Sequence, residues 1–395
     1  MRILMVAHSF PRADGDVAGA FLWRLGEGLV DRGHEVTVLA PADRGDVGQP
    51  MLGRVRVRRI RYASPEGEVL AYHGTMHVLA AKNPLLALNF GRMLRALARA
   101  VDEETRTAGA HIIHAHWWVP GGLAVRYAKR HGRPFVVTLH GSDVRLAGRV
   151  PGGRALMASV LRQAATVTAV SSFLAADAAD ALGVPRTTIP LTPMPLALGV
   201  GADPDQARAG AIFVGRLTRQ KGVHDLLEAL AILKRDGRPM DLTVVGDGPE
   251  RGNLKAQARA AGLNVTFTGF VAPESVPAHL RDKRVFVLPS SDEGLGLVVA
   301  EALTQGVPVV ATRSGGIPDL IVDPQAGMLV PTGSPLALAD AIRTVASEDR
   351  FKVGAWRAGR ILADRLSAEK VAEQFEAIYL RTRTSRASLA RPTSA

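Results

Sequence analysis

The feature that most constrains the fold of this chain is the alternation of short apolar runs with helix-length amphipathic segments. The runs are rich in Val, Ile and Leu, and most of them end in Gly, Ser, His or Asp, which is typical of parallel strands covered on both faces. They are 2–8, 34–40, 55–60, 110–116, 134–140, 166–171, 211–215, 242–248, 265–269, 285–290, 307–312 and 327–331. The helices between them predict βαβ crossovers and therefore an α/β protein with two doubly wound sheets.

A proline-rich stretch, 183–210, divides this pattern into two halves. Such a density of prolines is incompatible with a continuous helix or a central strand and is typical of a linker. We therefore predict two Rossmann-like domains that face a central cleft, with ligands beyond the carboxyl ends of the strands. The predicted division is an N-terminal domain over 1–190, a linker over 191–210, a C-terminal domain over 211–365, a helix over 366–384 that returns to the N-terminal domain, and a disordered tail over 385–395.

Composition excludes several classes of protein. The chain has 395 residues, 47% of them hydrophobic, which is typical of a globular protein and not of a disordered one. The absence of Cys excludes disulfides, thiolate metal sites and a cysteine nucleophile. No segment reaches the roughly 18 consecutive apolar residues of a membrane-spanning helix. The start, MRILMVAHSF, lacks the features of a signal peptide, so we expect a cytoplasmic protein.

The formal net charge of +12 lies mostly in the first half of the chain. No nucleic-acid-binding motif accompanies it and only 5% of residues are aromatic, so we expect no nucleic-acid partner. The strand 54–61 and the helix-like segment 84–101 place several arginines beside Leu and Phe. Such a segment fits peripheral contact with the inner face of an anionic membrane. It also fits a helix that packs on the core and exposes its arginines.

The segment 290–312 is the most informative about a possible ligand-binding site. Its strand ends at Ser290, glycines permit a turn, and a helix is predicted to begin near Leu295. The N–H groups of 296–298 would lack partners within that helix, and the helix dipole adds partial positive charge, so a phosphate can bind there. Glu301 lies about two turns along the helix, where a carboxylate can accept hydrogen bonds from the vicinal hydroxyls of a ribose.

The spacing of Glu293 and Glu301 in this segment resembles the E-x7-E signature of the retaining glycosyltransferases of family 4, which have the GT-B fold. A second segment, 212–230, is similar to the strand, G-R-L-x-x-x-K-G and helix of the same family. It places Gly215 and Arg216 at a strand end and Lys221 at a helix start. Two fixed cations there can stabilise the charge of a nucleoside diphosphate leaving group.

The resemblance continues over nearly the whole chain and implies a role for each matched residue. Arg216 and Lys221 would hold the diphosphate, and Glu293 would contact the donor sugar. His116 would lie beside the transferred sugar, and His140 and Asp143 would line the acceptor side. The implied donor-binding residues are Gly19, Gly215, Gly296, Leu297, Val298 and Glu301.

Two patterns could indicate a metal, and we predict none. His111, His114 and His116 lie close together in sequence, but no carboxylate accompanies them. The D-x-D pairs at 14–16 and 203–205 fall in loops that contain Gly or Pro, where chance accounts for them. The resemblance thus implies a retaining, metal-independent transfer of a sugar from a nucleoside-diphosphate sugar, a co-substrate and not a cofactor, to an acceptor hydroxyl.

The acceptor implied by this resemblance is a saccharide, a lipid-linked molecule or a small molecule. Two alternatives remain open at this point. A nucleotide-sugar epimerase or a phosphorylase could use the same architecture. A non-catalytic module that binds nucleotide sugars could keep the same residues.

Overall fold

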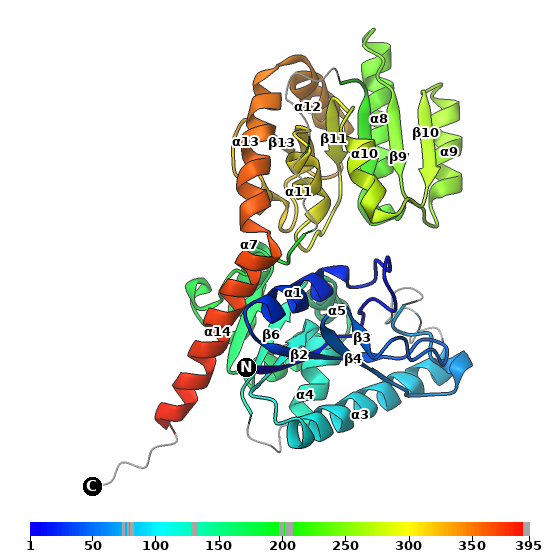
Figure 1. Ribbon diagram of the computed structural model, residues 1–395. Helices are drawn as coiled ribbons and strands as arrows, with labels where there is room; N and C mark the ends of the chain where they lie inside the picture. The colour runs from blue at the N-terminus through cyan, green and yellow to red at the C-terminus, as the bar shows by residue number, and fades with distance from the viewer. Residues whose placement is uncertain are drawn as a thin grey trace. The chain divides into compact units, whose positions relative to one another are not determined.

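The computed structural model describes residues 1–72, 76, 79, 83–127, 133–196, 201 and 208–389, without the side chains of 385–389. Two compact units are present. One consists of Met1–Pro195 with Ala368–Ala395, and the other of Leu196–Ser367. Figure 1 shows that each unit is a sheet flanked by helices.

The first unit contains a seven-stranded sheet with the order β3-β4-β2-β1-β5-β6-β7. All neighbouring strands are parallel except the short β3, which pairs antiparallel with β4. The strands are β1 Arg2–Val6, β2 Glu35–Pro41, β3 Met51–Leu52, β4 Val55–Ile60, β5 Ile112–His116, β6 Phe135–Leu139 and β7 Thr166–Ala169. The helices are α1 Ala20–Asp31, α3 Pro84–Thr107, α4 Leu123–Tyr127, α5 Ser142–Arg149, α6 Gly153–Leu161, α7 Ser172–Leu182 and α14 Ala368–Leu389.

The second unit contains a six-stranded parallel sheet with the order β10-β9-β8-β11-β12-β13. The strands are β8 Ala211–Val214, β9 Leu242–Val245, β10 Val265–Gly269, β11 Val285–Leu288, β12 Val309–Thr312 and β13 Gly327–Val330. The helices are α8 Val223–Arg235, α9 Arg251–Ala260, α10 Val276–Leu280, α11 Leu297–Thr304, α12 Pro335–Ser347 and α13 Arg350–Arg365.

Both sheets have the strand order of a dinucleotide-binding fold, which confirms the predicted α/β class. Leaving out β3, each sheet reads 3-2-1-4-5-6 when its strands are numbered along the chain. In such a sheet the strand order reverses between the first and fourth strands, and ligands bind beyond the carboxyl ends of these two strands. The loops after β1 and β5 form this switch point in the first unit, and the loops after β8 and β11 form it in the second.

The last helix, α14, belongs to the first unit, where it packs against α1. The approach is close, because a Cβ at Gly28 of α1 would lie 2.6 Å from the carbonyl oxygen of Ala368. The helix extends to Leu389, into the segment 385–395 for which composition predicts disorder. Residues 390–395 lie outside the described part of the chain, as does much of the predicted linker. Among the helices that the structure describes, none is long and apolar enough to cross a membrane.

A buried histidine joins α14 to the sheet. His114 in β5 is fully buried, with Nδ1 2.7 Å from the hydroxyl of Tyr379 and Nε2 2.7 Å from Oγ1 of Thr138. Its ring also lies 4.0 Å from that of His116, between centroids. Burial lowers the pKa of His114 from 6.5 to about 3, so the imidazole is neutral at pH 7.

Acid should therefore destabilise the fold through His114. Between pH 6.5 and about 3 the unfolded chain binds a proton at this residue and the folded chain does not, so the free energy of unfolding falls as pH falls. At pH 5 the loss from His114 alone is about 2 kcal/mol. The free energy of unfolding, measured with urea, should be lower at pH 5 than at pH 7.5. This difference should be smaller by about 2 kcal/mol in His114→Gln than in the unaltered protein. His279→Gln, outside the core, should keep the drop of the unaltered protein; an equal drop in all three proteins would contradict the assignment.

Candidate functional site

Three of the charged residues singled out in the sequence lie at the switch point of the second unit. Arg216 follows β8, Lys221 ends the short 3-10 turn Arg219–Lys221, and Glu293 follows β11. Lys221 Nζ donates a hydrogen bond to Glu293 Oε1, forming a largely shielded ion pair. Arg216 is exposed, and its side chain has no partner in the part of the chain that the structure describes. One paired and one unpaired cation thus flank the same sheet edge.

Backbone and side-chain contacts fix these loops relative to each other. The N–H of Ser291 donates to the carbonyl of Gln220 at 2.9 Å, and Gln220 Nε2 donates to the carbonyl of Asp292 at 3.2 Å. The loop after β8 is held from its other side, because the N–H of Gly215 donates to the carbonyl of Val245 at 2.9 Å. The positions of Arg216 and Lys221 are therefore set by hydrogen bonds of neighbouring loops.

Helix α11 begins within this group of loops. Gly296 is its N-cap residue, and Leu297 and Val298 form its first turn. The N–H of Val299 donates to the carbonyl of Gly296 at 2.8 Å, which closes that turn. An unpaired helix start carries partial positive charge and can bind an anion. Glu301 lies further along α11 and is half-buried.

In the first unit, the loop after β1 approaches the start of α1 closely. Gly19 is the N-cap residue of α1 with φ +75°, and a Cβ there would lie 2.4 Å from the carbonyl oxygen of Ser9. Only glycine fits this position, because both the backbone conformation and the contact exclude a side chain. The loop that carries Ser9 and Phe10 is thereby held against the helix start.

His116 ends β5 at the same switch point and is fully buried. Its Nδ1 lies 3.2 Å from Nε2 of His140, which follows β6, and its Nε2 has no hydrogen-bond partner in the described chain. The ring of Trp117 lies 4.2 Å from that of His8 and 4.3 Å from that of His140, between centroids. Burial lowers the pKa of His8 to about 4 and the pKa values of His116 and His140 well below 6.5. All three imidazoles are neutral at pH 7 and suited to hydrogen bonding with hydroxyls.

Asp143 has a different environment from His140. Its side chain is buried, and both carboxylate oxygens accept hydrogen bonds from backbone N–H groups. The donors are Trp118 at 3.1 Å, Gly141 at 2.9 Å and His140 at 3.2 Å. Asp143 therefore fixes the loops that carry Trp117 and His140, and of the two predicted acceptor-side residues only His140 keeps a side chain directed at the aromatic cluster.

Two residues with strained backbone lie beside the predicted site residues. Among the residues that the structure describes, the non-glycine residues with positive φ are Arg44, Trp117 and Asp292. Trp117 follows His116, and Asp292 precedes Glu293. Such conformations cost about 1–3 kcal/mol each and cluster at functional sites.

The side chains that could have indicated a metal have protein partners instead. Both ring nitrogens of His114 have neighbours in the core, His111 Nδ1 accepts from the N–H of Arg2 at 2.9 Å, and Asp16 pairs with Arg12 at 2.6 Å. The second D-x-D pair, 203–205, lies outside the described residues. Within the described ranges, no three His, Asp or Glu side chains are grouped as metal ligands would be.

Sequence reasoning missed His8 and Phe21 as members of this cluster. The ring of Phe21 lies 5.5 Å from that of His140, and His8 Nδ1 is shielded without a hydrogen-bond partner among the described residues. A signal for His8 was present, because it is the last residue of the first apolar run, 2–8, at the carboxyl end of the strand. Phe21 offered none, because its position in α1 depends on the tertiary packing of the helix.

Comparison with known proteins gives one consistent result. A family model described as a glycosyl transferase 4-like domain matches residues 18–195, and one described as glycosyl transferases group 1 matches residues 204–355. The GDP-mannose-dependent alpha-(1-6)-phosphatidylinositol monomannoside mannosyltransferase of Mycobacterium tuberculosis is 30% identical over 389 residues, which cover 91% of this chain and 92% of that protein.

Solved structures agree in fold. Sucrose-phosphate synthase from Thermosynechococcus elongatus matches with a TM-score of 0.76 and 21% identity, over 98% of this chain and 100% of that one. The HepE protein of Anabaena in complex with UDP matches with a TM-score of 0.72 and 20% identity, over 96% and 99% of the two chains. At these identities the likeness establishes the fold alone.

Proposed function

The chain belongs to the group 1 glycosyltransferases, of the family 4 type with the GT-B fold, and we propose that it transfers its sugar with retention at the anomeric carbon and without a metal ion. Membership in this family makes it a nucleotide-sugar glycosyltransferase. This membership favours sugar transfer over the epimerase, the phosphorylase and the non-catalytic module that the sequence alone left open.

The observation that carries the proposal is the convergence of Arg216, Lys221 and the start of α11 at one switch point. A diphosphate leaving group gains negative charge as the bond to the sugar breaks. Fixed guanidinium, ammonium and amide groups stabilise such charge strongly when they are already in position. The Lys221 ammonium has three N–H donors, so its bond to Glu293 leaves two for phosphate oxygens. Glu293 would contact the donor sugar, and Glu301 the ribose.

The proposed reaction breaks one bond, forms one bond and moves one proton. The bond between the anomeric carbon and the diphosphate oxygen breaks, and the electron pair leaves with the diphosphate. The acceptor oxygen forms the new bond on the same face of the sugar, and its proton passes to a phosphate oxygen. His116 and His8, each with a shielded nitrogen that lacks a partner among the described residues, would hold sugar hydroxyls by hydrogen bonds. Gly19 would let the backbone approach the donor, and His140 would face the acceptor.

Binding of nucleoside diphosphates tests the donor site. The M. tuberculosis relative is named for GDP-mannose and the HepE structure contains UDP, so the panel should include UDP, GDP and ADP. At 100 times its dissociation constant, the correct one should stabilise the fold by about 2.7 kcal/mol. The shift should persist in EDTA, and sugar transfer with the matching donor should also survive EDTA and give a product with the donor's anomeric configuration by NMR. Loss of transfer in EDTA would disprove metal independence.

We also keep peripheral contact with an anionic membrane as a proposal, now narrowed to α3. The arginines of β4 do not form a free basic face, because Arg56 and Arg58 both pair with Glu104. The apolar residues of α3 fall into a buried and an exposed group. Met93 and Leu97 pack in the core, whereas Leu85 and Leu88 are 58% and 50% exposed. Co-sedimentation of the full chain with anionic vesicles at low salt tests this contact.

A further inference from the structure

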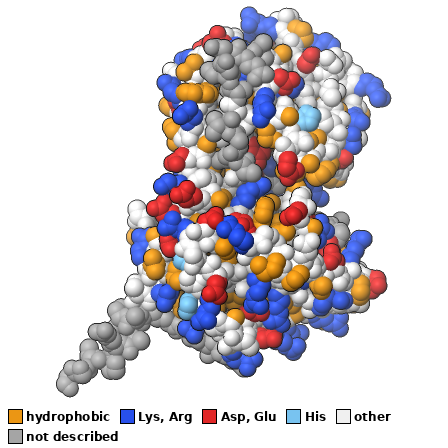
Figure 2. All heavy atoms as spheres, in the orientation of Figure 1, with side chains coloured by type: hydrophobic (Ala, Val, Ile, Leu, Met, Phe, Trp, Pro, Cys, Tyr) orange, Lys and Arg blue, Asp and Glu red, His pale blue; other side chains and the backbone are white. Residues whose placement is uncertain are grey.

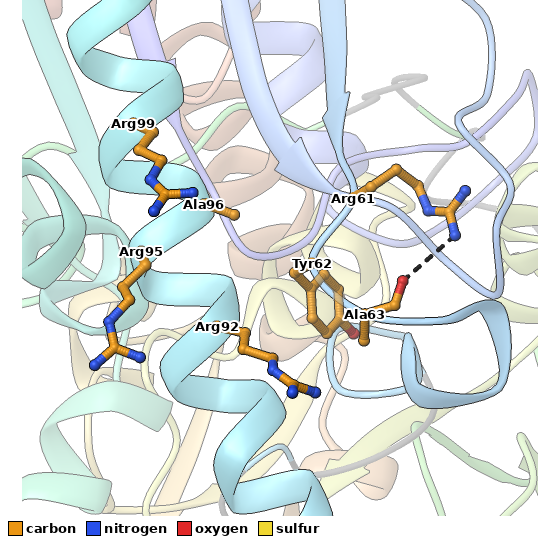
Figure 3. A pocket seen from close by; sticks show the side chains of 7 residues that line it. All are labelled: Arg61, Tyr62, Ala63, Arg92, Arg95, Ala96 and Arg99. Carbon is orange, nitrogen blue, oxygen red and sulfur yellow. Dashed lines mark hydrogen bonds between the residues drawn. The ribbon is translucent and has the colours of Figure 1, made fainter.

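A basic pocket lies in the first unit, apart from the site described above. It has a volume of about 410 Å³ and is formed by the segment after β4 and one face of α3. Its lining residues are Arg61, Tyr62, Ala63, Arg92, Arg95, Ala96 and Arg99. Figure 3 shows the three α3 arginines in a row along the helix, opposite Tyr62 and Ala63. Their spacing of three and four residues places them on one helix face.

Several arginines near the pocket are neutralised by carboxylates. Arg54 pairs with Glu27 at 2.8 Å, and Arg58 pairs with Glu103 at 2.7 Å. Arg12 likewise contacts Asp43 at 2.6 Å. The folded domain therefore supplies acidic partners to these arginines.

Inside the pocket the pattern differs. Arg61 pairs with the buried Glu68 at 2.8 Å, whereas the partner of Arg92 among the described residues is the neutral amide of Asn89, at 3.1 Å. In the described part of the chain, Arg95 and Arg99 have no carboxylate partner. Like charges at this spacing repel each other on a helix. Figure 2 shows Lys and Arg side chains gathered over the lower domain, which is the first unit.

The chemistry of the lining specifies the occupant. Three guanidinium groups without a carboxylate partner in the described ranges line one hollow, and they match a compact group with several negative charges, because guanidinium forks pair well with phosphate oxygens. A single carboxylate would leave two of the three charges without a partner. The pocket therefore fits a phosphate monoester or a diphosphate.

The pocket also lies at the sheet edge that carries His116. Arg61 to Ala63 directly follow β4, and the carboxyl ends of β4 and β5 lie at the same end of the parallel sheet. Strands β2 and β1 lie between β4 and β5 in the order β4-β2-β1-β5. Three strand spacings amount to about 14 Å. We propose that Arg92, Arg95 and Arg99 bind the phosphate or diphosphate group of the sugar acceptor, whose reactive hydroxyl lies toward His116. This inference rests on the proposed function and narrows the acceptor to a phosphate-bearing molecule.

The phosphate could belong to a water-soluble acceptor or to a lipid, and the experiment separates these sources. The first probe is inorganic pyrophosphate, titrated calorimetrically into the full chain carrying Arg216→Ala, so that the donor site contributes little. Adding Arg95→Gln and Arg99→Gln should weaken its binding at least about tenfold. Arg106→Gln, an exposed arginine of α3 outside the pocket, is the matched control and should leave binding unchanged.

The second probe is a vesicle of phosphatidylcholine with phosphatidic acid, compared with phosphatidylcholine alone. Binding of pyrophosphate that depends on Arg95 and Arg99 supports the site and a soluble source. Binding only to phosphatidic acid vesicles, again lost in the double variant, supports the site and a lipid source. If the double variant binds both probes as tightly as Arg106→Gln, the inference is overturned. A failure of the donor site would appear separately, as no thermal stabilisation by any nucleoside diphosphate.

Discussion

Replacement of Arg216 by alanine is expected to lower kcat/KM by about 10²–10³-fold, the loss typical of removing one preorganised group that stabilises a developing negative charge. The thermal unfolding midpoint should stay unchanged, because Arg216 is exposed and its side chain lacks a partner among the described residues. Transfer assays and thermal unfolding on the same preparations give both numbers.

Arg219→Ala is the matched control, because Arg219 is an exposed arginine of the adjoining turn. It should retain most of the activity, whereas a general effect of lost positive charge near the site would lower the activity of both variants alike. Near-normal turnover in Arg216→Ala would remove Arg216 from the diphosphate site.

Lys221 should behave differently, because it has a structural partner. Lys221→Ala removes a cation from the site and also leaves the buried Glu293 without its ion pair. Activity should fall as in Arg216→Ala, and the free energy of unfolding should also fall, by about 2 kcal/mol. Adding Glu293→Gln should restore most of the stability and none of the activity. A stable but inactive Lys221→Ala would show that the pair contributes little to folding.

The sequence was sufficient to predict the strands of both sheets, because continuous apolar runs that end in Gly, Ser or His are a strong local signal. It was not sufficient for their order. The parallel partners of β1 are β2 and β5, and nothing in the apolar run of β1 specifies which segments lie beside it. The short β3 was missed for the opposite reason, since two residues carry no period.

In the candidate site, too, some features could be predicted from the sequence and others could not. The positions of Arg216 and Glu293 at strand ends followed from the sequence, but the ion pair between Lys221 and Glu293 joins residues 72 positions apart and depends on the neighbouring places of β8 and β11. The burial of Asp143 could not be predicted either, because a Gly-Ser-Asp sequence after a strand is equally typical of an exposed turn. The family resemblance supplied roles, and the structure supplied contacts.

Replacement of Gly315 by alanine should produce the largest loss of stability among the changes considered. Gly315 has φ +55°, and a Cβ there would lie 1.8 Å from the carbonyl oxygen of Glu293. The next residue donates its N–H to the same oxygen at 3.1 Å, and Ser314 Oγ accepts from the N–H of Asp292 at 2.8 Å. The loop after β12 thus holds the backbone of Glu293, and a methyl group would force the two loops apart.

Two costs add in Gly315→Ala. A left-handed backbone costs a non-glycine residue about 1–2 kcal/mol, and overpacking against fixed backbone costs about 1–3 kcal/mol more. We expect a total loss of about 3 kcal/mol, with loss of the nucleoside diphosphate stabilisation, because the displaced loop carries Glu293, the ion-pair partner of Lys221. Gly333→Ala is the control that separates the two costs: Gly333 has φ +67° with no atom within 4 Å of the added Cβ. It should lose about 1 kcal/mol and keep the ligand response. Equal losses in the two variants, measured by urea unfolding, would mean that the contact between Gly315 and Glu293 does not constrain the site.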